Sequence, residues 1–497
     1  MQKKNKIKKS KEMKEVHLDK NERIEDVKKE EEELKIYGEL TLGNINSLRK
    51  LYVKKLDLSN SNNSSFPDFV FLNFTSLTNI ILPESINSIG NYSFYCCENL
   101  KEVDMSICSS LKSLNIGFLR YCYSLSNNKL PDSLNEISDY AFERCLSLKS
   151  IILPKSLKRI GESAFLGCMS LKVINLPSSI NKIGSYAFNW CNSLEEIEIP
   201  KTVSIITTCV FSKCKSLKKV KLYNEIKIIE DGAFFGCSSL EKINLPNSLK
   251  QINSRAFENC SCLQKIEIPE SIESIGLDLF KGCNSLEEIK VDPRNKFYHD
   301  KDGVLFNKDK TVLIKFPAKK GVLGYCIPET VKIIEENAFE SCDFIQRITQ
   351  ADTKYLNGVL KIPLLLNKIK CDAFNNCRNI RKLELLTDIN LNKRFEYCNS
   401  LSYIKITKKV FQSNTYFLSN TQGKNIISID NGFIYFESKY YSNHRKEIKV
   451  FGLYNGNVYF KQKNLILYHL SDYVEPKVEF KFIINAFNNS YLFSWIF

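Results

Sequence analysis

The sequence is poor in the groups that catalytic and metal sites need. Its 497 residues contain only 4 His, and no Cys-x-x-Cys pair occurs among its 18 Cys. Structural zinc is held by about four converging ligands of these types, so we expect no metal and no other cofactor. No Ser, Cys or acid stands beside a histidine in a recognised catalytic arrangement. We therefore expect surface histidines and a protein that is not an enzyme. The four are His17, His299, His444 and His469.

Long apolar segments and phosphate loops are missing too. The N-terminal stretch MQKKNKIKKSKEMKEV has no apolar core after its lysines, which argues against a cleaved secretory signal. No run of about 18 uncharged apolar residues occurs, so we expect no membrane-spanning helix. The segment 321–324, Gly-Val-Leu-Gly, lacks the Gly-Lys-Ser/Thr that a phosphate loop requires. These absences favour a cytoplasmic protein.

The net charge of +15 comes from abundant Lys and raises the question of acidic partners. Spread over a long chain, this surplus produces only a weak field, and no recognised nucleic-acid-binding motif is present. We expect no specific nucleic acid partner. Hydrophobic content of 43% with 32 Phe indicates a folded chain.

What the sequence does contain is an internal repeat. Each unit has Phe, then Cys three positions later and Leu six positions later, as in Phe142, Cys145 and Leu148. Seven consecutive units follow one another without a slip, which indicates a stacked array. The Phe of these units recurs every 23 residues at Phe142, Phe165, Phe188, Phe211, Phe234, Phe257 and Phe280. Less regular units begin at Phe71, Phe94, Leu119, Phe339, Phe374 and Phe395.

Each unit also contains a strand pattern. Residues 148–153 match L-x-x-L-x-L, which predicts one short strand per repeat with Ile152 pointing outward. Pro154 follows and ends the strand, because proline cannot donate to a ladder. A single unit exposes apolar residues on both its flat faces, and only neighbouring units can cover them. The pattern predicts an α/β-type repeat solenoid with predominant short parallel strands.

The full spacing A-F-x-x-C-x-S-L-x-x-I-x-L-P-x-S-L-x-x-I-G resembles the BspA-like, or treponemal-type, leucine-rich repeats. The resemblance is strong over residues 71–400 and loose over 401–497. It implies a leucine-rich-repeat arc of about 23-residue units with β-hairpin insertions. It also implies a binding or adhesion surface, since the family occurs in bacterial surface proteins.

Two insertions fit this family. Residues 302–314 read as two strands around a polar turn, and 430–436 with 448–451 look like a divergent second copy. Residues 1–36 have basic and acidic runs with few apolar residues, which predicts a disordered or partly helical tail. We expect this charged segment at 1–36, repeat blocks at 37–291 and 323–425, hairpin insertions at 292–322 and 426–470, and a degenerate terminal repeat at 471–497.

The cysteines have a structural explanation. Twelve of the 18 occupy the slot after Phe, where a small and fairly apolar side chain can pack in a ladder. Disulfides between neighbouring ladder cysteines remain an alternative, because stacked strands lie about 4.8 Å apart, although a disulfide also needs suitable orientation.

The outward strand positions carry charges of opposite sign in successive repeats. In a parallel in-register ladder these residues stand side by side, so they either fix the register or form a mixed-charge docking surface on the concave face. We predict a non-enzymatic protein–protein interaction scaffold that binds a protein partner there. The alternative is a cell-surface-associated, adhesin-like protein. The predicted partner-binding residues are Glu195, Glu196, Glu198, Lys218, Lys219, Lys221, Glu241, Lys242, Lys265 and Glu267.

Overall fold

A computed structural model describes most of the chain. It covers residues 13–20, 22–350, 356–385, 389–391, 393–401 and 403–406, and the backbone of strands over 423–429, 432–440, 446–454, 457–459 and 484–485. The chain divides into two compact units. Unit 1 comprises Met1–Cys262 with Ser271–Leu279, and unit 2 comprises Leu263–Glu270 with Phe280–Phe497. Each unit is described by itself.

Unit 1 begins earlier than the sequence predicted. Strands β1 (Lys14–His17) and β2 (Glu33–Tyr37) pair in parallel and open a six-stranded sheet. The prediction of a disordered segment at 1–36 is therefore wrong from residue 13 onward, Asn21 aside, because Val16, Leu34 and Ile36 are buried. Two short 3₁₀ helices, η1 (Leu18–Lys20) and η2 (Ile24–Asp26), connect these strands.

One α-helix, α1 (Leu42–Lys50), is the only one among the described residues. Thr41 caps its N-terminus and forms a reciprocal capping box with Asn44. The sequence predicted an α/β-type solenoid, whereas the described residues contain very little helix.

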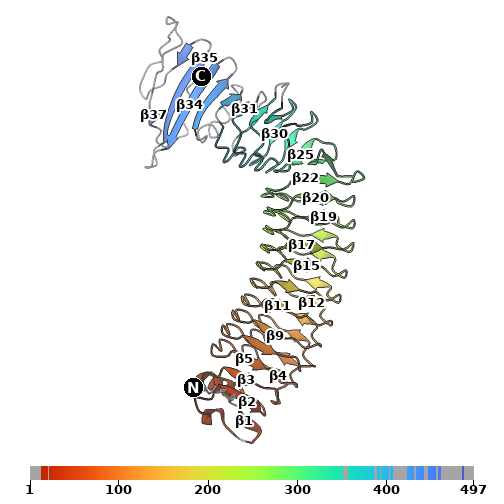
Figure 1. Ribbon diagram of the computed structural model, residues 1–497, viewed down its shortest axis with the longest axis vertical. Coiled ribbons are helices and arrows are strands. Elements are labelled where there is room, and N and C mark those ends of the chain that lie inside the picture. The colour runs from red at the N-terminus through yellow and green to blue at the C-terminus, as the bar shows by residue number, and fades with distance from the viewer. Residues whose placement is uncertain are drawn as a thin grey trace, which may run out of the picture. The chain divides into compact units, whose positions relative to one another are not determined.

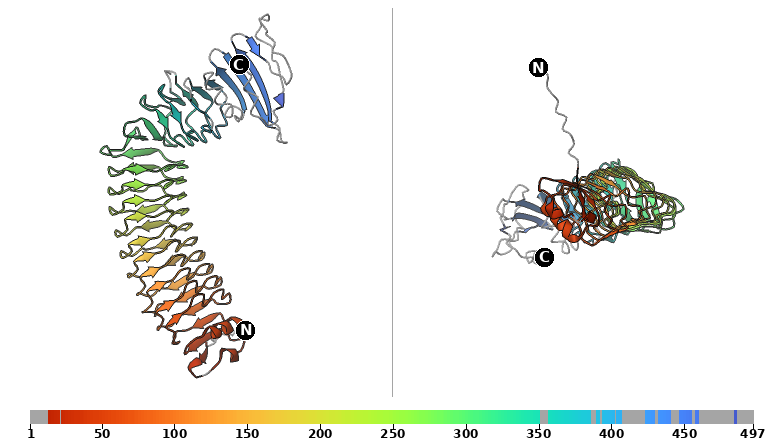
Figure 2. Two further views of the ribbon diagram at one scale, coloured as in Figure 1. Left: turned by 180° about the vertical axis from the view of Figure 1, so that it is seen from behind. Right: turned by 90° about the horizontal axis from the view of Figure 1, so that it is seen from below.

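Each later turn of unit 1 contains two short strands. A front strand is followed by a turn that contains proline in most repeats (the Pro turn), then by a rear strand and by the turn that holds the repeating Phe (the Phe turn). Figures 1 and 2 show these turns stacked one on the next. The front strands are β3 (Lys55–Asp57), β5 (Asn79–Ile81), β7 (Glu102–Asp104), β9 (Asn127–Lys129), β11 (Ser150–Ile151), β13 (Val173–Ile174), β15 (Glu196–Glu198) and β17 (Lys219–Lys221). The rear strands are β4 (Ser65–Phe66), β6 (Ser88–Ile89), β8 (Ser113–Leu114), β10 (Glu136–Ile137), β12 (Arg159–Ile160), β14 (Lys182–Ile183), β16 (Ile205–Ile206), β18 (Ile228–Ile229), β19 (Gln251–Ile252) and β21 (Ser274–Ile275).

Pairing between turns is parallel and follows the sequence repeat. Ile160 stands beside Ile183 in the rear ladder, and Ile197 stands beside Val220 in the front ladder. Side chains alternate, so the middle residues of β15 and β17 are buried and their neighbours are exposed. The predicted parallel-strand solenoid of about 23-residue turns is confirmed.

The buried Phe side chains form a continuous stack in unit 1. Neighbouring rings from Phe142 to Phe257 lie 5.1–5.7 Å apart between centroids and are nearly parallel. Each ring thus covers an apolar face of the adjacent turn. Offset-stacked rings also stabilise the stack beyond the contribution of their buried surface area. This stack explains why no single turn is stable alone.

The ladder cysteines do more than fill space. The Sγ of Cys168 donates to the carbonyl of Phe142 in the preceding turn at 3.1 Å, and Cys214 does the same to Phe188 at 3.1 Å. The thiol is therefore a second donor to a buried carbonyl, which also accepts from the backbone N–H of the cysteine in its own turn, as Phe142 does from Cys145. All 18 cysteines lie in the described part of the chain, and each is a free thiol. The packing interpretation describes this structure better than the disulfide alternative.

A second ladder of hydroxyls runs along the Pro turns. The Oγ of Ser179 donates to the carbonyl of Leu157 at 2.6 Å, and Ser248 donates to Ile226 at 2.6 Å. The Ser of the repeat pattern is thus explained, because its hydroxyl joins one turn to the turn before it.

Unit 2 starts with a parallel pair and then departs from the repeat. Strands β20 (Lys265–Ile268) and β22 (Glu288–Val291) pair in parallel. Three antiparallel strands follow, β23 (Tyr298–Lys301), β24 (Val304–Asn307) and β25 (Val312–Lys315). Two of them surround the polar turn that the sequence predicted at 302–314. Strand β25 returns the chain to a parallel ladder with β27 (Ile333–Ile334) and β30 (Lys368–Ile369).

A buried ion pair joins this insertion to the next turn. Lys315 and Glu340 are almost fully buried, and their charged atoms lie 3.9 Å apart. Lys315 also donates to the carbonyl of Asn337 at 2.8 Å, and Glu340 accepts from the backbone N–H of Gly282 at 2.8 Å. Hydrogen bonds to both charges offset part of their desolvation cost.

The rest of unit 2 is a ten-stranded sheet. Its parallel part is formed by β26 (Gly324–Cys326), β29 (Val359–Lys361), β28 (Arg347–Thr349), β31 (Lys382–Leu385), β32 (Tyr403–Ile406) and β33 (Gly423–Ile429). Its antiparallel part is formed by β34 (Gly432–Tyr440), β35 (Lys446–Tyr454), β36 (Asn457–Tyr459) and β37 (Ile484–Asn485).

One expectation for the C-terminal region agrees with the strand pairing and one needs correction. The segments predicted as a second hairpin form β34 and β35, which pair antiparallel, and β33 joins them to the repeat sheet at β32. The predicted terminal repeat at 471–497 lies mostly outside the described residues. Its described part, β37, pairs antiparallel with β35, whereas a further repeat would pair in parallel.

Candidate functional site: the outward face of the front strands

Six of the ten predicted partner-binding residues lie at outward positions of front strands, namely Glu196, Glu198, Lys219, Lys221, Lys265 and Glu267. We call the outward face of the front strands in unit 1, from β5 to β17, the strand face. Because strands alternate, every second residue of the L-x-x-L-x-L segment reaches it. Three zones follow one another along it, namely a polar network, an apolar patch and a charged zone.

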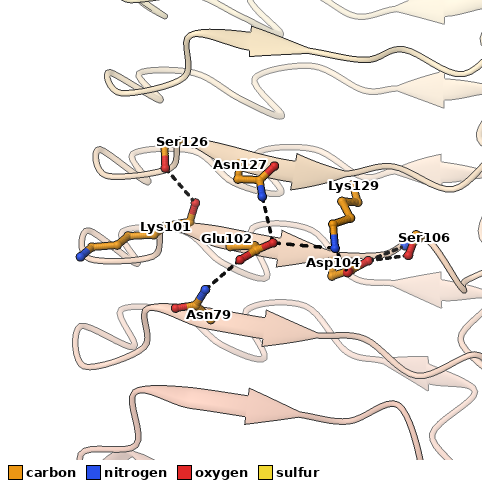
Figure 3. A network of polar contacts seen from close by, with 8 residues as sticks. All are labelled: Asn79, Lys101, Glu102, Asp104, Ser106, Ser126, Asn127 and Lys129. Carbon is orange, nitrogen blue, oxygen red and sulfur yellow. Dashed lines mark hydrogen bonds and ion pairs between the residues drawn. The ribbon is translucent and has the colours of Figure 1, made fainter. Parts of the chain in front are cut away.

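The polar network covers β5, β7 and β9 (Figure 3). Glu102 accepts from the side-chain amides of Asn79 at 3.0 Å and Asn127 at 2.9 Å, one on each neighbouring strand. Asp104 accepts from Lys129 at 2.6 Å and from the hydroxyl of Ser106 at 2.6 Å. Each carboxylate of the central strand thus has partners on another strand.

The pKa values of this network reflect those partners. Burial raises the pKa of Asp104, but the hydrogen bonds from Lys129 and Ser106 outweigh it, and the pKa lies below its usual value. The hydrogen bond to Asp104 in turn raises the pKa of Lys129. Both groups stay ionised near neutral pH, so this zone acts as a set of cross-strand clamps.

Two exposed apolar residues, Ile152 and Val173, lie on neighbouring turns and are offset by two residues, because Val173 stands beside Ser150. We call these two residues the apolar patch. Ile152 follows β11 and is 88% exposed, the most exposed of the large hydrophobic side chains described. Val173, on β13, is 41% exposed. Polar or charged residues occupy the corresponding positions of the flanking strands, such as Lys129 and Glu196. The sequence placed Ile152 outward but did not identify it as a candidate site residue.

The charged zone contains most of the predicted site residues. Glu198 and Lys221 form an ion pair at 2.9 Å between β15 and β17, as the register predicted. Glu196 stands beside Lys219 in the same ladder. Glu195, however, pairs at 3.3 Å with Lys172 of the preceding turn, which the prediction did not include.

Glu198 has a further partner that the sequence pattern did not reveal. The hydroxyl of Tyr223 donates to its carboxylate, and the ammonium of Lys221 lies 5.0 Å from the Tyr223 ring centroid. The hydrogen bond from Tyr223, followed by that from Lys221, lowers the pKa of Glu198. Tyr223 lies at the position where most repeats have proline. This departure from the repeat was the sequence signal that could have identified it.

The remaining predicted residues do not join this cluster in the same way. Lys218, Glu241 and Lys242 are exposed in their turns of unit 1. Lys265 and Glu267 lie on β20 in unit 2, where Lys265 pairs with Glu288 at 3.6 Å. Glu267 stands beside Lys290 in that ladder. Alternating charges across neighbouring strands therefore recur in both units.

Within the described residues, no group of three or more His, Cys, Asp and Glu side chains is placed to hold a metal ion. His444 and His469 lie outside those residues. In the same part of the chain, no helix is long and apolar enough to cross a membrane.

These features define a leucine-rich-repeat solenoid, and comparison with known proteins supplies its family. The family model described as "BspA type Leucine rich repeat region (6 copies)" matches residues 44–172, 135–238, 181–306 and 325–449. These matches span well over half of the chain, and the protein belongs to this family. The predicted resemblance is confirmed.

One similar solved structure supports the fold. A leucine-rich repeat protein from Bacteroides ovatus is 24% identical, with a TM-score of 0.53, and the match covers 74% of this chain and 87% of that one. A leucine rich cell surface protein from Faecalibacterium prausnitzii is 23% identical, with a TM-score of 0.39, and covers 74% of this chain and 83% of its own. A search of curated proteins returned no match.

Proposed function

We propose that the protein is a non-enzymatic scaffold that binds a protein partner on the strand face, centred on Ile152 and Val173. The observation that carries this proposal is the 88% exposure of Ile152 within an otherwise polar face. A solvent-exposed isoleucine contributes nothing to the interior of the repeat. Covering it with a partner would stabilise a complex by about 1.5–3 kcal/mol.

The surroundings of the patch suit a protein partner. Interfaces combine an apolar centre with a polar rim, and only a few central residues dominate the binding energy. Here the rim is the polar network around Glu102 on one side and the Lys172–Glu195 pair on the other. Mixed charges on this rim favour a partner with charges of both signs.

The charged zone has two compatible roles in this proposal. Its pairs link adjacent strands and so support the register of the solenoid. Their exposed edges also remain open to a partner, and such rim charges act more on the rate of association than on affinity. Lys218, Lys219 and Lys221 belong to this rim.

The test compares three full-length variants in affinity capture from cells of the source organism. Ile152→Glu with Val173→Glu should remove the main captured protein, with at least a tenfold loss corresponding to about 1.4 kcal/mol. The triple variant Lys218→Glu, Lys219→Glu and Lys221→Glu should weaken capture less and make it less sensitive to salt. Lys155→Glu, exposed on a Pro turn, is the matched control and should capture as the parent does.

Unchanged capture by the Ile152 and Val173 variant would remove the strand face from consideration. Circular dichroism of each variant must match the parent, since exposed substitutions of this kind usually change the free energy of unfolding by less than about 0.5 kcal/mol.

A second candidate is an adhesin-like protein at the cell surface. Family membership supports this candidate, because resemblance to the family implies a binding or adhesion role at a surface. Labelling intact cells with a membrane-impermeant biotin reagent tests this location. A labelled protein supports the surface role, and an unlabelled protein in fully viable cells contradicts it.

A further inference from the structure

The Phe turns of unit 1 hold residues in an uncommon backbone conformation. Two positions per turn, two residues before and two residues after the repeating Phe, have positive φ. At the second position the chain uses Gly167 (φ +72°) and Gly236 (φ +70°) in two turns. Other turns place large side chains there, including Tyr121 (φ +64°) and Arg144 (φ +58°). A bulky residue in this region costs about 1–2 kcal/mol relative to glycine.

Four of the large residues at these positions lie in one cluster together with Tyr95 and Arg120, which have ordinary φ. We call it the Tyr–Arg edge, and its members are Tyr92, Tyr95, Arg120, Tyr121, Tyr140 and Arg144. Tyr92 contacts Tyr95 edge-on at 5.8 Å between ring centroids, and Tyr95 lies 5.3 Å from Tyr121. Repeated use of strained positions for tyrosine and arginine, where glycine fits the same turn, indicates a use for the side chains themselves.

Arg120 holds the cluster rigid. Its guanidinium lies 4.8 Å from the Tyr121 ring centroid and 5.1 Å from that of Tyr140. It forms an ion pair at 2.8 Å with Glu143, whose side chain is only 6% exposed. Little conformational entropy is therefore left to lose when a partner binds, and this preorganisation favours affinity.

The neighbouring turns fix two of the side chains further. Tyr92 stacks on Phe69 at 5.5 Å, and its ring covers Gly117, where an added Cβ would meet ring atoms at 2.3 Å. The stem of Arg144 lies over Gly167, where an added Cβ would meet its Cγ at 3.3 Å. Both glycines thus leave room for a side chain from the turn before.

The cluster favours a protein partner over a nucleic acid. Bases bind by stacking on free aromatic faces. Here Phe69 covers one face of Tyr92 and Gly117 the other, and the guanidinium of Arg120 lies over the rings of Tyr121 and Tyr140. The ring edges and hydroxyls of such residues suit protein recognition, in which rigid tyrosines give contact area and arginine marks the strongest contacts.

The charge of Arg144 identifies the chemistry of the partner. Its side chain is exposed, with the guanidinium 5.8 Å from the Tyr121 ring centroid. Among the described residues, no carboxylate lies within ion-pair distance of it, whereas Arg120 and Arg159 both have such partners. A planar guanidinium with free donors is suited to a carboxylate.

We propose that the Tyr–Arg edge is a second interaction surface, which binds a protein segment presenting a carboxylate beside apolar side chains. The carboxylate accepts hydrogen bonds from Arg144, and the apolar side chains cover the edges of Tyr95 and Tyr121. This surface lies on the Phe turns and shares no residue with the strand face. Failure of either proposal therefore leaves the other intact.

The test selects from a displayed library of random peptides with the full-length protein, and counter-selects on the variant Arg144→Gly. Glycine accepts the positive φ of this position, so the variant should fold at least as stably as the parent. Recovered peptides should contain Asp or Glu next to apolar residues. They should bind the parent about tenfold or more tightly than Arg144→Gly.

Matched variants sharpen the result. Arg144→Lys keeps the charge but loses the planar fork, and should give intermediate affinity. Lys155→Glu, on a Pro turn, should bind the peptides as the parent does. Peptides without an acid preference, or no enrichment at all, would overturn the proposal. Binding of a mixed-sequence single-stranded DNA, or dimerisation of the chain, that is lost in Arg144→Gly would also overturn it, in favour of a nucleic acid or a second copy.

Discussion

Neighbouring turns are joined in both the regular block of unit 1 and the hairpin junction of unit 2, but the side chains that join them differ. Between Phe142 and Phe257 every turn is joined to the next by stacked rings and by neutral thiols that donate to carbonyls. At the hairpin, Phe316 continues the stack onto Phe339 at 5.1 Å. The stacked rings are thus kept at the hairpin, whereas the hydrogen bonds from thiols to carbonyls are replaced.

The replacement is a buried charge pair. Lys315 precedes Phe316 at the position that Ala occupies in most regular turns, and it pairs with Glu340. Cys342 donates within its own turn, to the carbonyl of Glu340 at 3.8 Å, rather than to the preceding Phe. A hydrogen bond from a neutral thiol can recur in every turn because it desolvates no charge. A buried ion pair between turns is stable only when both charged partners are present.

The largest expected effect is a loss of stability at alkaline pH, which the buried thiols of both regions share. Burial raises the pKa of Cys97 to about 12 and also raises that of Cys214. An unfolded thiol has a pKa near 9, so between about pH 9 and 12 the unfolded chain binds fewer protons than the folded one. Stability is complete below this range and falls as pH rises, by about 1.4 kcal/mol per ladder thiol per pH unit.

Urea unfolding at a series of pH values measures this loss. The matched control is the triple variant Cys168→Ala, Cys191→Ala and Cys214→Ala, which should show a shallower decline above pH 9. Parallel curves for the parent and this variant would show that the buried thiols do not cause the loss.

Removal of one ring from the Phe stack should have the next largest effect. Phe211 is fully buried, and its ring lies 5.6 Å from Phe188 and 5.7 Å from Phe234. Phe211→Ala should reduce the free energy of unfolding by about 3–5 kcal/mol, from lost burial and the cavity left behind. Chemical denaturation measures it, with the exposed Ile152→Ala as control. Equal stability of the two variants would contradict the core position of Phe211.

Breaking the charged joint should cost somewhat less. Lys315→Met leaves the Glu340 carboxylate buried with the Gly282 N–H as its remaining donor in this network, and should destabilise by about 3 kcal/mol. The double variant Lys315→Met and Glu340→Gln should recover most of this loss, because no unpaired charge remains. A double variant as unstable as the two single losses combined would show that the charges are not coupled.

The smallest effect is a gain at an irregular turn. Asn128 holds the inward position of β9 opposite Val103, and neither atom of its side-chain amide has a hydrogen-bond partner in the structure. Asn128→Val should raise the free energy of unfolding by about 1–2 kcal/mol, because the polar group no longer needs a partner. Thermal unfolding checks this. A destabilised variant would indicate that the amide binds ordered water.

The inward positions were predictable from the sequence because burial repeats with the period of the chain. Phe, Leu and Ile recur at fixed spacing, and the structure buries most of them in the regular block, whereas Leu176 and Leu245, before the Pro turn, are half-buried. The thiol ladder was only half predictable, since packing explains a small residue after Phe but not its hydrogen bond. Strands β1 and β2 escaped prediction because their short alternation is hidden in a charge-rich segment.

The outward positions were much less predictable. The Glu198–Lys221 pair follows from register, but the Tyr223 contact and the Lys172–Glu195 pair depend on side-chain reach between turns. The Tyr–Arg edge depends on positive φ at positions where the sequence shows no glycine. A periodic sequence pattern cannot predict positive φ at a position that holds a different residue type in most turns.

The central claim is that inward residues build the solenoid and that Ile152 and Val173 are available to a partner. Unfolding and partner capture measured together on Ile152→Glu with Val173→Glu test it most directly. We expect a free energy of unfolding within about 0.5 kcal/mol of the parent, together with loss of capture. A large loss of stability, or full capture by the variant, would contradict it.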